Sequence, residues 1–384
     1  MSLDLPHALD AGPRPTSLKE RWVAWRNGLL SSPKFQRFAA RFPLTRPVAS
    51  KRASELFDLV GGFVYSQILY ASVETRLLSH LKSGASDLPD VIAATGLPRD
   101  GALRLLDGAI SLRLVERVSD KRYALGDLGA ALMANPGVLA MIRHHALLYS
   151  DLSDPIALLR SNEAPSRVGD FWAYARQDGS RDLSSDEVAE YSDLMAVSQQ
   201  FIATEILDNY DVSKHKQLLD VGGGQGAFAI AAADRAPGLT VSVFDLPAVA
   251  ARAAERFDGA GLGHRAIAHG GDLFADALPQ GADLVTLVRV LYDHNDRSVE
   301  AILSAVYHAL PSGGMLLVSE PMAETPGAEA MGAAYFGFYL LAMRSGASRS
   351  PKTLTEFLRN AGFQQVRLLR SKSPLLTRTL VCKK

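Results

Sequence analysis

The chain has 384 residues, too many for a single small core, and its 47% hydrophobic and 21% charged residues are typical of a globular, water-soluble protein. Basic and acidic residues number 41 each, so no overall positive field favours nucleic acid as a partner. The lone cysteine, Cys382, excludes an internal disulfide framework and a cysteine-based zinc site, which fits a reducing cytoplasm.

The balanced charge conceals a basic N-terminal arm, which we assign to residues 1–58. Residues 14–52 contain ten basic residues against Glu20 alone, a net charge of +9. Large apolar residues are interleaved with these charges: Trp22, Trp25, Leu29, Leu30, Phe35, Phe38 and Phe42. This pattern is typical of an element on an anionic membrane surface, or of an arm packed on the acidic remainder of its own or a partner subunit.

Neither a secretory signal nor a membrane span is expected. No apolar run follows a basic start at the N-terminus. The most apolar long stretch, Gly327–Met343, contains Glu329 and is too short to cross a bilayer. We expect a cytoplasmic protein whose membrane contact, if the arm provides one, is peripheral and on the inner face.

Residues 59–136 predict a mainly helical winged-helix domain. Its second helix carries only Arg99 and Arg104 as cations, too few for a DNA recognition helix, so we expect dimerisation and substrate enclosure instead. The expected elements are helices over Ser66–Leu81, 86–95 closed by Gly96, and 98–112, then strands Leu114–Val118 and Tyr123–Leu125.

Residues 137–210 predict a helical linker that contributes to a substrate pocket. Its expected elements are a helix over Ala140–Leu148, a short segment at Phe171-Trp172, and a long helix near Ser185–Leu207.

Residues 211–384 predict a doubly wound, mainly parallel, Rossmann-like α/β domain, because short apolar runs alternate with amphipathic helices. Ligands of such sheets bind beyond the carboxyl ends of the strands, where the strand order reverses. The expected strands are Gln217–Val221, Thr240–Phe244, Leu284–Val288, Met315–Val318, Val366–Leu369 and Leu376–Val381, with one more ending before Asp272.

A glycine loop follows the first of these strands. Gly222, Gly224 and Ala227 satisfy a dinucleotide fingerprint, which leaves an NAD oxidoreductase as a rival. Asp220, however, would repel a pyrophosphate, whereas it suits a ligand that carries an ammonium and a sulfonium. The glycine spacing, completed by Gly226, supports the same assignment.

Two further aspartates follow the next strand ends. Asp245 is placed to accept hydrogen bonds from both hydroxyls of a ribose. Asp272, which is followed by Leu273-Phe274, is placed to accept a hydrogen bond from the amine of an adenine. Any one of them has an alternative role as a turn or cap residue. Three after consecutive strands favour a nucleoside site.

Five segments together resemble the small-molecule O-methyltransferases of plants and bacteria, over roughly residues 60–384. They are LLDVGGGQG (218–226), VFDLP (243–247), GGDLF (270–274), VRVLYDHND (288–296) and LPSGGMLLVSEPM (310–322). The resemblance implies a class I methyltransferase fold, a homodimer, S-adenosylmethionine as methyl donor, S-adenosylhomocysteine as product, and no metal. It also implies the cofactor residues Asp220, Gly222, Gly224, Gly226, Asp245, Leu246, Asp272, Leu273, Phe274 and Arg289.

A narrower resemblance, to the carotenoid O-methyltransferases of purple photosynthetic bacteria, rests on the segments 34–53, GFVYSQ (62–67) and 327–343. It implies that the methyl acceptor is apolar, namely an acyclic carotenoid that carries a tertiary 1-hydroxyl. Two alternatives are a C-methyltransferase acting on a bacteriochlorophyll precursor, and a non-catalytic regulator that binds S-adenosylmethionine.

The sequence departs from the plant pattern at the catalytic base. Tyr292 stands where plant members carry histidine, and His294 follows two residues later. Glu320 matches the first of two supporting carboxylates, while no carboxylate is found near Ser348-Arg349 for the second. Because a tertiary alcohol is a poor acid, we expect His294 or Tyr292 to accept the proton late in the transfer.

The acceptor pocket is expected to be apolar, and His144 with His145 is a second candidate catalytic pair. Aromatic and methionine residues at helical spacing are more often core than pocket. The candidate wall residues are Met195, Phe171, Phe336, Tyr339, Met343 and His144.

Overall fold

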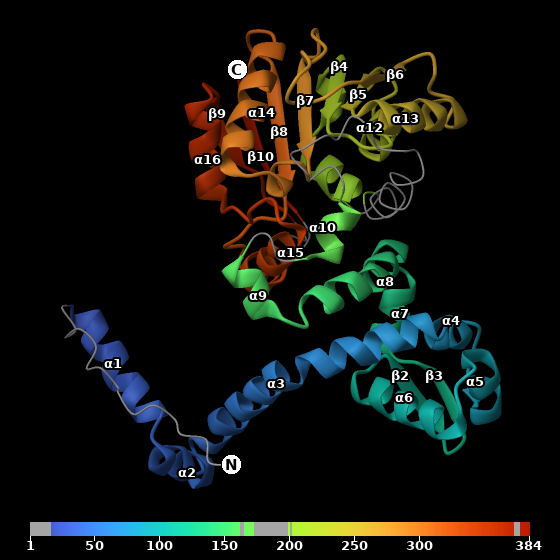
Figure 1. Cartoon of the computed structure of the whole chain (residues 1–384), viewed down its shortest axis with the longest axis vertical. Coiled ribbons are helices and arrows are strands. Elements are labelled where there is room, and N and C mark those ends of the chain that lie inside the picture. The colour runs from blue at the N-terminus through green and yellow to red at the C-terminus, as the bar shows by residue number, and fades with distance from the viewer. Residues whose placement is uncertain (1–16, 162–164, 173–198, 200–201, 372–376) are drawn as a thin grey trace. The chain divides into compact units, whose positions relative to one another are not determined.

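The computed structural model describes residues 17–161, 165–172, 199, 202–371 and 377–384. The chain divides into two compact units, Met1–Leu69 and Tyr70–Lys384 (Figure 1). Each unit is described by itself.

The first unit is built from helices: α1 (Leu18–Leu30), α2 (Pro33–Arg41) and most of α3 (Arg46–Glu74). Ser17 and Glu20 form a capping box at the start of α1, and Ser32 caps α2 ahead of Pro33. Ala39 is the buried residue of α1 and α2, and the aromatic side chains of Trp22, Trp25 and Phe38 are exposed.

Helix α3 is the one described helix that is long and apolar enough to cross a membrane, by length and composition. The sequence-based expectation singled out Gly327–Met343 and overlooked this helix, because basic residues crowd its first two turns. Such a helix is weak evidence for a membrane span.

The second unit begins with the winged-helix elements, and its wing has a third strand that was not expected. Strand β1 pairs with β3 through only two residues, too few for a sequence pattern. The expected helix over Ser66–Leu81 is two helices, because the chain breaks at Arg76 with φ of 63°. The elements are α4 (Leu77–Leu81), β1 (Ser86–Asp87), α5 (Leu88–Thr95), α6 (Arg99–Ser111), β2 (Val115–Ser119), β3 (Arg122–Leu125) and α7 (Asp127–Met133).

Three short helices follow: α8 (Pro136–Asp151), α9 (Pro155–Arg160) and α10 (Arg167–Phe171). Asp151 stabilises the start of α10, since its carboxylate accepts hydrogen bonds from the Arg167 and Val168 N–H groups at 2.8 Å. Of the expected long helix near Ser185–Leu207, residues 202–209 are helical, and 185–198 lie outside the described residues.

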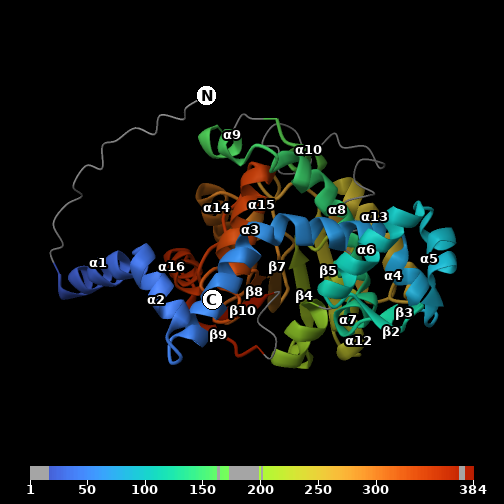
Figure 2. The same ribbon diagram turned by 90° about the horizontal axis from the view of Figure 1, so that it is seen from below.

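A seven-stranded sheet carries the C-terminal domain, in the order β6-β5-β4-β7-β8-β10-β9. All seven strands are labelled in Figure 1, and Figure 2 shows the same sheet from below. The first five are parallel, and β10 is antiparallel to both neighbours. The order reverses between β4 and β7, where a ligand is expected. The strands are β4 (Gln217–Val221), β5 (Thr240–Asp245), β6 (Ala266–Gly270), β7 (Leu284–Val288), β8 (Met315–Glu320), β9 (Gln364–Leu368) and β10 (Arg378–Lys383).

Helices cover both faces of this sheet, so its central strands are buried throughout. Leu218 packs in one core cluster with α12 and α13, and Leu219 packs in the other with α14 and α16. The remaining elements are η3 (Val212–Lys214), α12 (Ala227–Arg235), α13 (Pro247–Gly259), η4 (Leu291–Asp293), α14 (Asp296–Ala309), the π-helix η5 (Ala330–Tyr335), α15 (Phe336–Met343) and α16 (Pro351–Asn360).

Candidate active site

The glycine loop joins β4 to α12 at the point where the strand order reverses. Gly222, Gly224 and Gly226 have φ values of 67°, 58° and 76°, a region that favours glycine. A Cβ at Gly222 would lie 2.8 Å from Val290, and one at Gly226 would lie 2.5 Å from Phe257. At Gly224 a Cβ would meet nothing within 4 Å, so a ligand has room to approach the backbone there.

Asp220 lies buried beneath this loop. Its Oδ1 accepts a hydrogen bond from Thr286 Oγ1 at 2.6 Å, while Oδ2 has no partner among the described residues. Burial raises the pKa of Asp220 to about 7. A buried carboxylate oxygen without a partner is costly unless a donor reaches it, and a cationic ligand group beside the glycine loop would satisfy it.

Asp245 joins the end of β5 to the glycine loop. Its Oδ2 accepts from the Gly224 N–H and its Oδ1 from the Leu246 N–H, both at 2.8 Å. Burial raises its pKa to about 6. Each carboxylate oxygen has a second lone pair, so the residue both shapes the loop and can still accept the two hydroxyls of a ribose.

Asp272, Leu273 and Phe274 follow β6. Asp272 Oδ1 accepts a hydrogen bond from the Phe274 N–H at 2.9 Å. This bond stabilises a turn, which is the alternative role considered for this aspartate. Leu273 packs against the core, whereas Phe274 is 54% exposed. The Phe274 ring meets the His294 ring edge-on, with 5.3 Å between the ring centres. The segment after β6 therefore borders the loop that carries Tyr292 and His294.

The structure places Arg289 at the end of β7, beside Tyr292. Arg289 has φ of 60°, and its N–H donates to the Ser319 carbonyl at 2.8 Å. Its guanidinium lies 6.0 Å from the centre of the Tyr292 ring and 3.5 Å from the Tyr292 hydroxyl. A non-glycine residue in the left-handed region is strained, and such strain concentrates at functional sites.

Glu320 holds the backbone of the loop that follows. Its Oε1 accepts from the Val290 N–H at 3.0 Å and from the Leu291 N–H at 2.7 Å. Its Oε2 has no hydrogen-bond partner in the described chain, and burial raises the pKa of Glu320 to about 8. The carboxylate therefore supports the loop that carries Tyr292 and His294 through the main chain.

Tyr292 and His294 differ in their fitness to accept a proton. Tyr292 is buried, and burial raises its pKa above the usual range, so the phenol stays neutral. Burial, aided by nearby Arg349, lowers the pKa of His294 to about 4, so its imidazole is neutral near pH 7. A neutral imidazole is the better acceptor, and we favour His294.

His144 and His145 are both engaged with the helix around Phe336. His144 Nε2 lies 2.8 Å from the Tyr339 hydroxyl, which also accepts from Trp172 Nε1 at 2.7 Å. His145 Nε2 lies 2.7 Å from the Tyr335 hydroxyl. Both histidines are therefore hydrogen-bonded to tyrosines of one aromatic cluster.

The predicted wall residues gather in that same cluster. Phe171, Phe336, Tyr339 and Met343 pack together with Tyr292, while Met195 lies outside the described residues. The cluster brings the linker helices against Tyr292.

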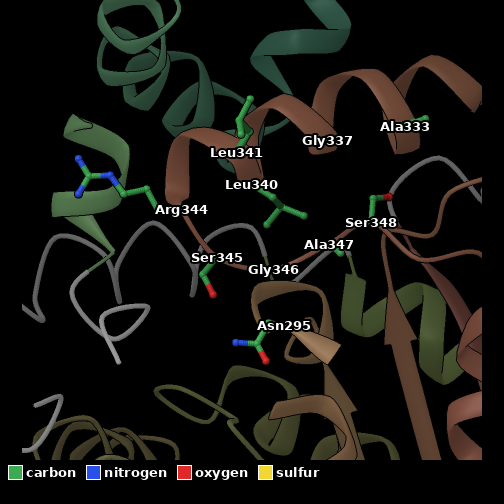
Figure 3. A pocket seen from close by; sticks show the side chains of 10 residues that line it. All are labelled: Asn295, Ala333, Gly337, Leu340, Leu341, Arg344, Ser345, Gly346, Ala347 and Ser348. Carbon is green, nitrogen blue, oxygen red and sulfur yellow. The ribbon is translucent and has the colours of Figure 1, made fainter. Parts of the chain in front are cut away.

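A cavity of about 770 Å³ lies along α15, and its lining residues are not among the wall residues expected from the sequence. Figure 3 shows Leu340 pointing from α15 toward residues 345–348, with Asn295 beyond them. The signal that was missed is the pair of small residues one helical turn apart, Ala333 and Gly337. The other lining residues are Leu341, Arg344, Ser345, Gly346, Ala347 and Ser348.

Residues 149–364 match the family described as an O-methyltransferase domain, and residues 57–135 match an O-methyltransferase dimerisation domain, which supports a homodimer. The demethylspheroidene O-methyltransferase of Cereibacter sphaeroides is 40% identical over 88% of this chain and 89% of its own length. That of Rhodobacter capsulatus is 41% identical over 88% and 84%.

Among solved structures, human N-acetylserotonin methyltransferase in complex with SAM matches with a TM-score of 0.72 and 24% identity, over 87% of this chain and 97% of that one. The mitomycin 7-O-methyltransferase matches with a TM-score of 0.72 and 24% identity, over 88% and 100%. These two likenesses establish the fold.

The raised pKa of Asp220 predicts pH-dependent cofactor binding. The carboxylate must be ionised to bind the cofactor's ammonium, so affinity for S-adenosylmethionine should increase roughly five- to tenfold from pH 6 to 7.5. Isothermal titration calorimetry measures this. Asp220→Asn should weaken binding and flatten the dependence, and an unchanged slope in that variant would contradict the assignment.

Substitution separates the two candidate proton acceptors. His294→Ala should lower kcat by about 100-fold, as loss of a general base typically does. Tyr292→Phe should lower kcat less than His294→Ala, because the buried phenol stays neutral. Exposed His264→Ala is the matched control and should leave kcat unchanged. Near-normal turnover in the double variant Tyr292→Phe, His294→Phe would exclude both residues as the proton acceptor.

Proposed function

The chain belongs to the O-methyltransferase family, and on this premise we propose that its acceptor is the tertiary 1-hydroxyl of an acyclic carotenoid. It is an S-adenosylmethionine-dependent enzyme. The observation that carries the proposal is its 40% and 41% identity to two demethylspheroidene O-methyltransferases, across 88% of the chain.

The bound cofactor supplies an electrophilic methyl group on a sulfonium. Asp220 has a buried carboxylate oxygen without a partner in the described chain, which suits a cationic group. Asp245 can accept hydrogen bonds from ribose hydroxyls, and the backbone at Gly224 is open to a nucleoside. The acceptor oxygen attacks in line, so its bond to the methyl carbon forms as the sulfur–carbon bond breaks. His294 takes the proton late, once the oxygen has become acidic, and positioning supplies most of the acceleration.

The cavity along α15 has room for an acceptor and offers it both apolar and polar contacts. Ala333, Gly337 and Leu340 give it an apolar side, whereas Asn295 and Ser345 give it a polar side. Its volume of about 770 Å³ falls within the usual range for small-molecule sites.

Methyl transfer from labelled S-adenosylmethionine in detergent tests the acceptor directly. Offered a 1-hydroxycarotenoid, a chlorophyllide and a flavonoid phenol, the enzyme should label the carotenoid ether alone. Label in the chlorophyllide would show instead a C-methyltransferase. No transfer to any acceptor, with cofactor binding intact, would contradict the carotenoid proposal.

We also propose that the arm contacts an anionic membrane surface. Trp22, Trp25 and Phe38 are 55%, 65% and 57% exposed, within a segment whose net charge is +9. The dimerisation domain begins at residue 57, so these residues lie outside it. A basic helix pair with exposed tryptophans suits an interface with anionic lipid, and a carotenoid is dissolved in membranes.

Tryptophan fluorescence measures this contact, because two of the three tryptophans lie in the arm and Trp172 is buried. Vesicles with anionic phosphatidylglycerol should shift the emission of the full chain to the blue, and salt should reverse the shift. Neutral phosphatidylcholine vesicles should have little effect. The variant with Trp22→Phe and Trp25→Phe should show no shift; an equal shift from Trp172 alone would contradict the proposal.

A further inference from the structure

The loop after β7 is held through four of its carbonyls by the strap, which we define as residues 345–349. Four successive carbonyls, those of residues 291–294, each accept a hydrogen bond from the strap. Ser345 Oγ donates to the Asp293 carbonyl at 2.6 Å, and the Ala347 N–H donates to the Tyr292 carbonyl at 2.9 Å. Arg349 supplies the other two donors.

Arg349 uses all five of its N–H donors in this contact. Nη1 donates to the Leu291 carbonyl at 2.8 Å and to the Ala347 carbonyl at 3.4 Å. Nη2 donates to the His294 carbonyl and to Asp296 Oδ1, both at 2.7 Å, and Nε donates to the same oxygen at 2.9 Å. The Arg349 side chain is only 4% exposed. Such a fully bonded guanidinium has a single orientation.

The close approach of strap and loop also depends on Gly346. A Cβ there would lie 2.1 Å from the Tyr292 carbonyl oxygen, and its φ of 89° disfavours other residues. On the opposite side, Glu320 accepts from the Val290 and Leu291 N–H groups. The loop is therefore held through its donors by Glu320 and through its acceptors by the strap.

We propose that Arg349 is a positioning residue for methyl transfer, which fixes Tyr292 and His294 relative to the reacting atoms. It lies in the stretch where the plant enzymes would place a second carboxylate. In this chain the same stretch has Arg349, which hydrogen-bonds the main chain of the loop, in place of a carboxylate that would support a base.

Position matters here because an in-line displacement is steeply sensitive to geometry. A displacement of about 1 Å in an active-site group can lower turnover on the order of 100-fold. Lysine keeps the charge of Arg349 but has three donors on one nitrogen, so it cannot bridge Leu291, His294 and Asp296 together. Arg349→Lys thus tests the bonding pattern separately from the charge.

The kinetic test uses the full-length chain with an acceptor that the wild type methylates. Arg349→Lys should lower kcat at least tenfold, while the dissociation constant for S-adenosylmethionine changes less than threefold. Arg349→Ala should be impaired further, and millimolar guanidinium should restore part of its turnover. Exposed Arg359→Ala on α16 is the matched control and should behave as wild type. Unchanged kcat in Arg349→Lys, or loss of cofactor binding in parallel with kcat, would overturn the proposal.

Hydrogen–deuterium exchange gives a readout that needs no acceptor, so it stands even if the carotenoid proposal fails. With cofactor bound, Arg349→Lys should accelerate exchange of peptide 289–297 about tenfold and leave peptide 217–235 unchanged. Exchange identical to wild type in the loop would refute the role. Acceleration throughout the domain would also refute it, because it would indicate a general loss of stability.

Discussion

The fixed backbone of the loop after β7 is the constraint on which the rest of the site depends. A parallel sheet presents its functional residues from loops beyond the carboxyl ends of its strands, and loops are normally its least rigid parts. Here Glu320, at the end of β8, binds two N–H groups of the loop, and the strap binds four of its carbonyls. Neighbouring segments thus give this loop the hydrogen bonding that regular secondary structure would otherwise provide.

Buried acids at the same edge impose a cost on the fold that the bound cofactor can offset. Asp220 lies one residue before the end of β4, while Asp245 ends β5 and Glu320 ends β8. Burial raises the pKa of each. A carboxyl whose pKa is raised in the folded state destabilises that state once it ionises. Its contribution to stability is therefore fully present below about pH 4 and is lost as pH rises through about 6 to 8. A cationic ligand beside Asp220 favours the ionised form and reverses part of the loss.

Local patterns in the sequence were enough to predict the sheet and the glycine loop that follows its first strand. Gln217–Val221 and Leu284–Val288 are observed with the predicted bounds, because largely buried parallel strands read as short, mostly apolar runs. The strap was not predictable, since Arg349 contacts residues 53 to 58 positions earlier and an arginine has no spacing signature. The cavity along α15 was missed because large side chains dominate an apolar pattern, whereas Ala333 and Gly337 make room by being small. The break at Arg76 needs a left-handed residue that nothing in the helical pattern around it predicts.

A weakly acidic acceptor, such as the tertiary alcohol proposed above, accounts for the tyrosine at position 292, where the plant enzymes carry histidine. A phenol can be deprotonated before attack, so a base held by carboxylates speeds its methylation. A tertiary alcohol loses its proton only after the new bond has begun to form, and then even a weak base suffices. Burial lowers the pKa of His294 to about 4, which makes it a weak base that is never protonated beforehand. A neutral Tyr292 and a neutral His294 add no positive charge of their own beside the sulfonium. With such an acceptor the missing second carboxylate is unnecessary, and the strap can serve geometry in its place.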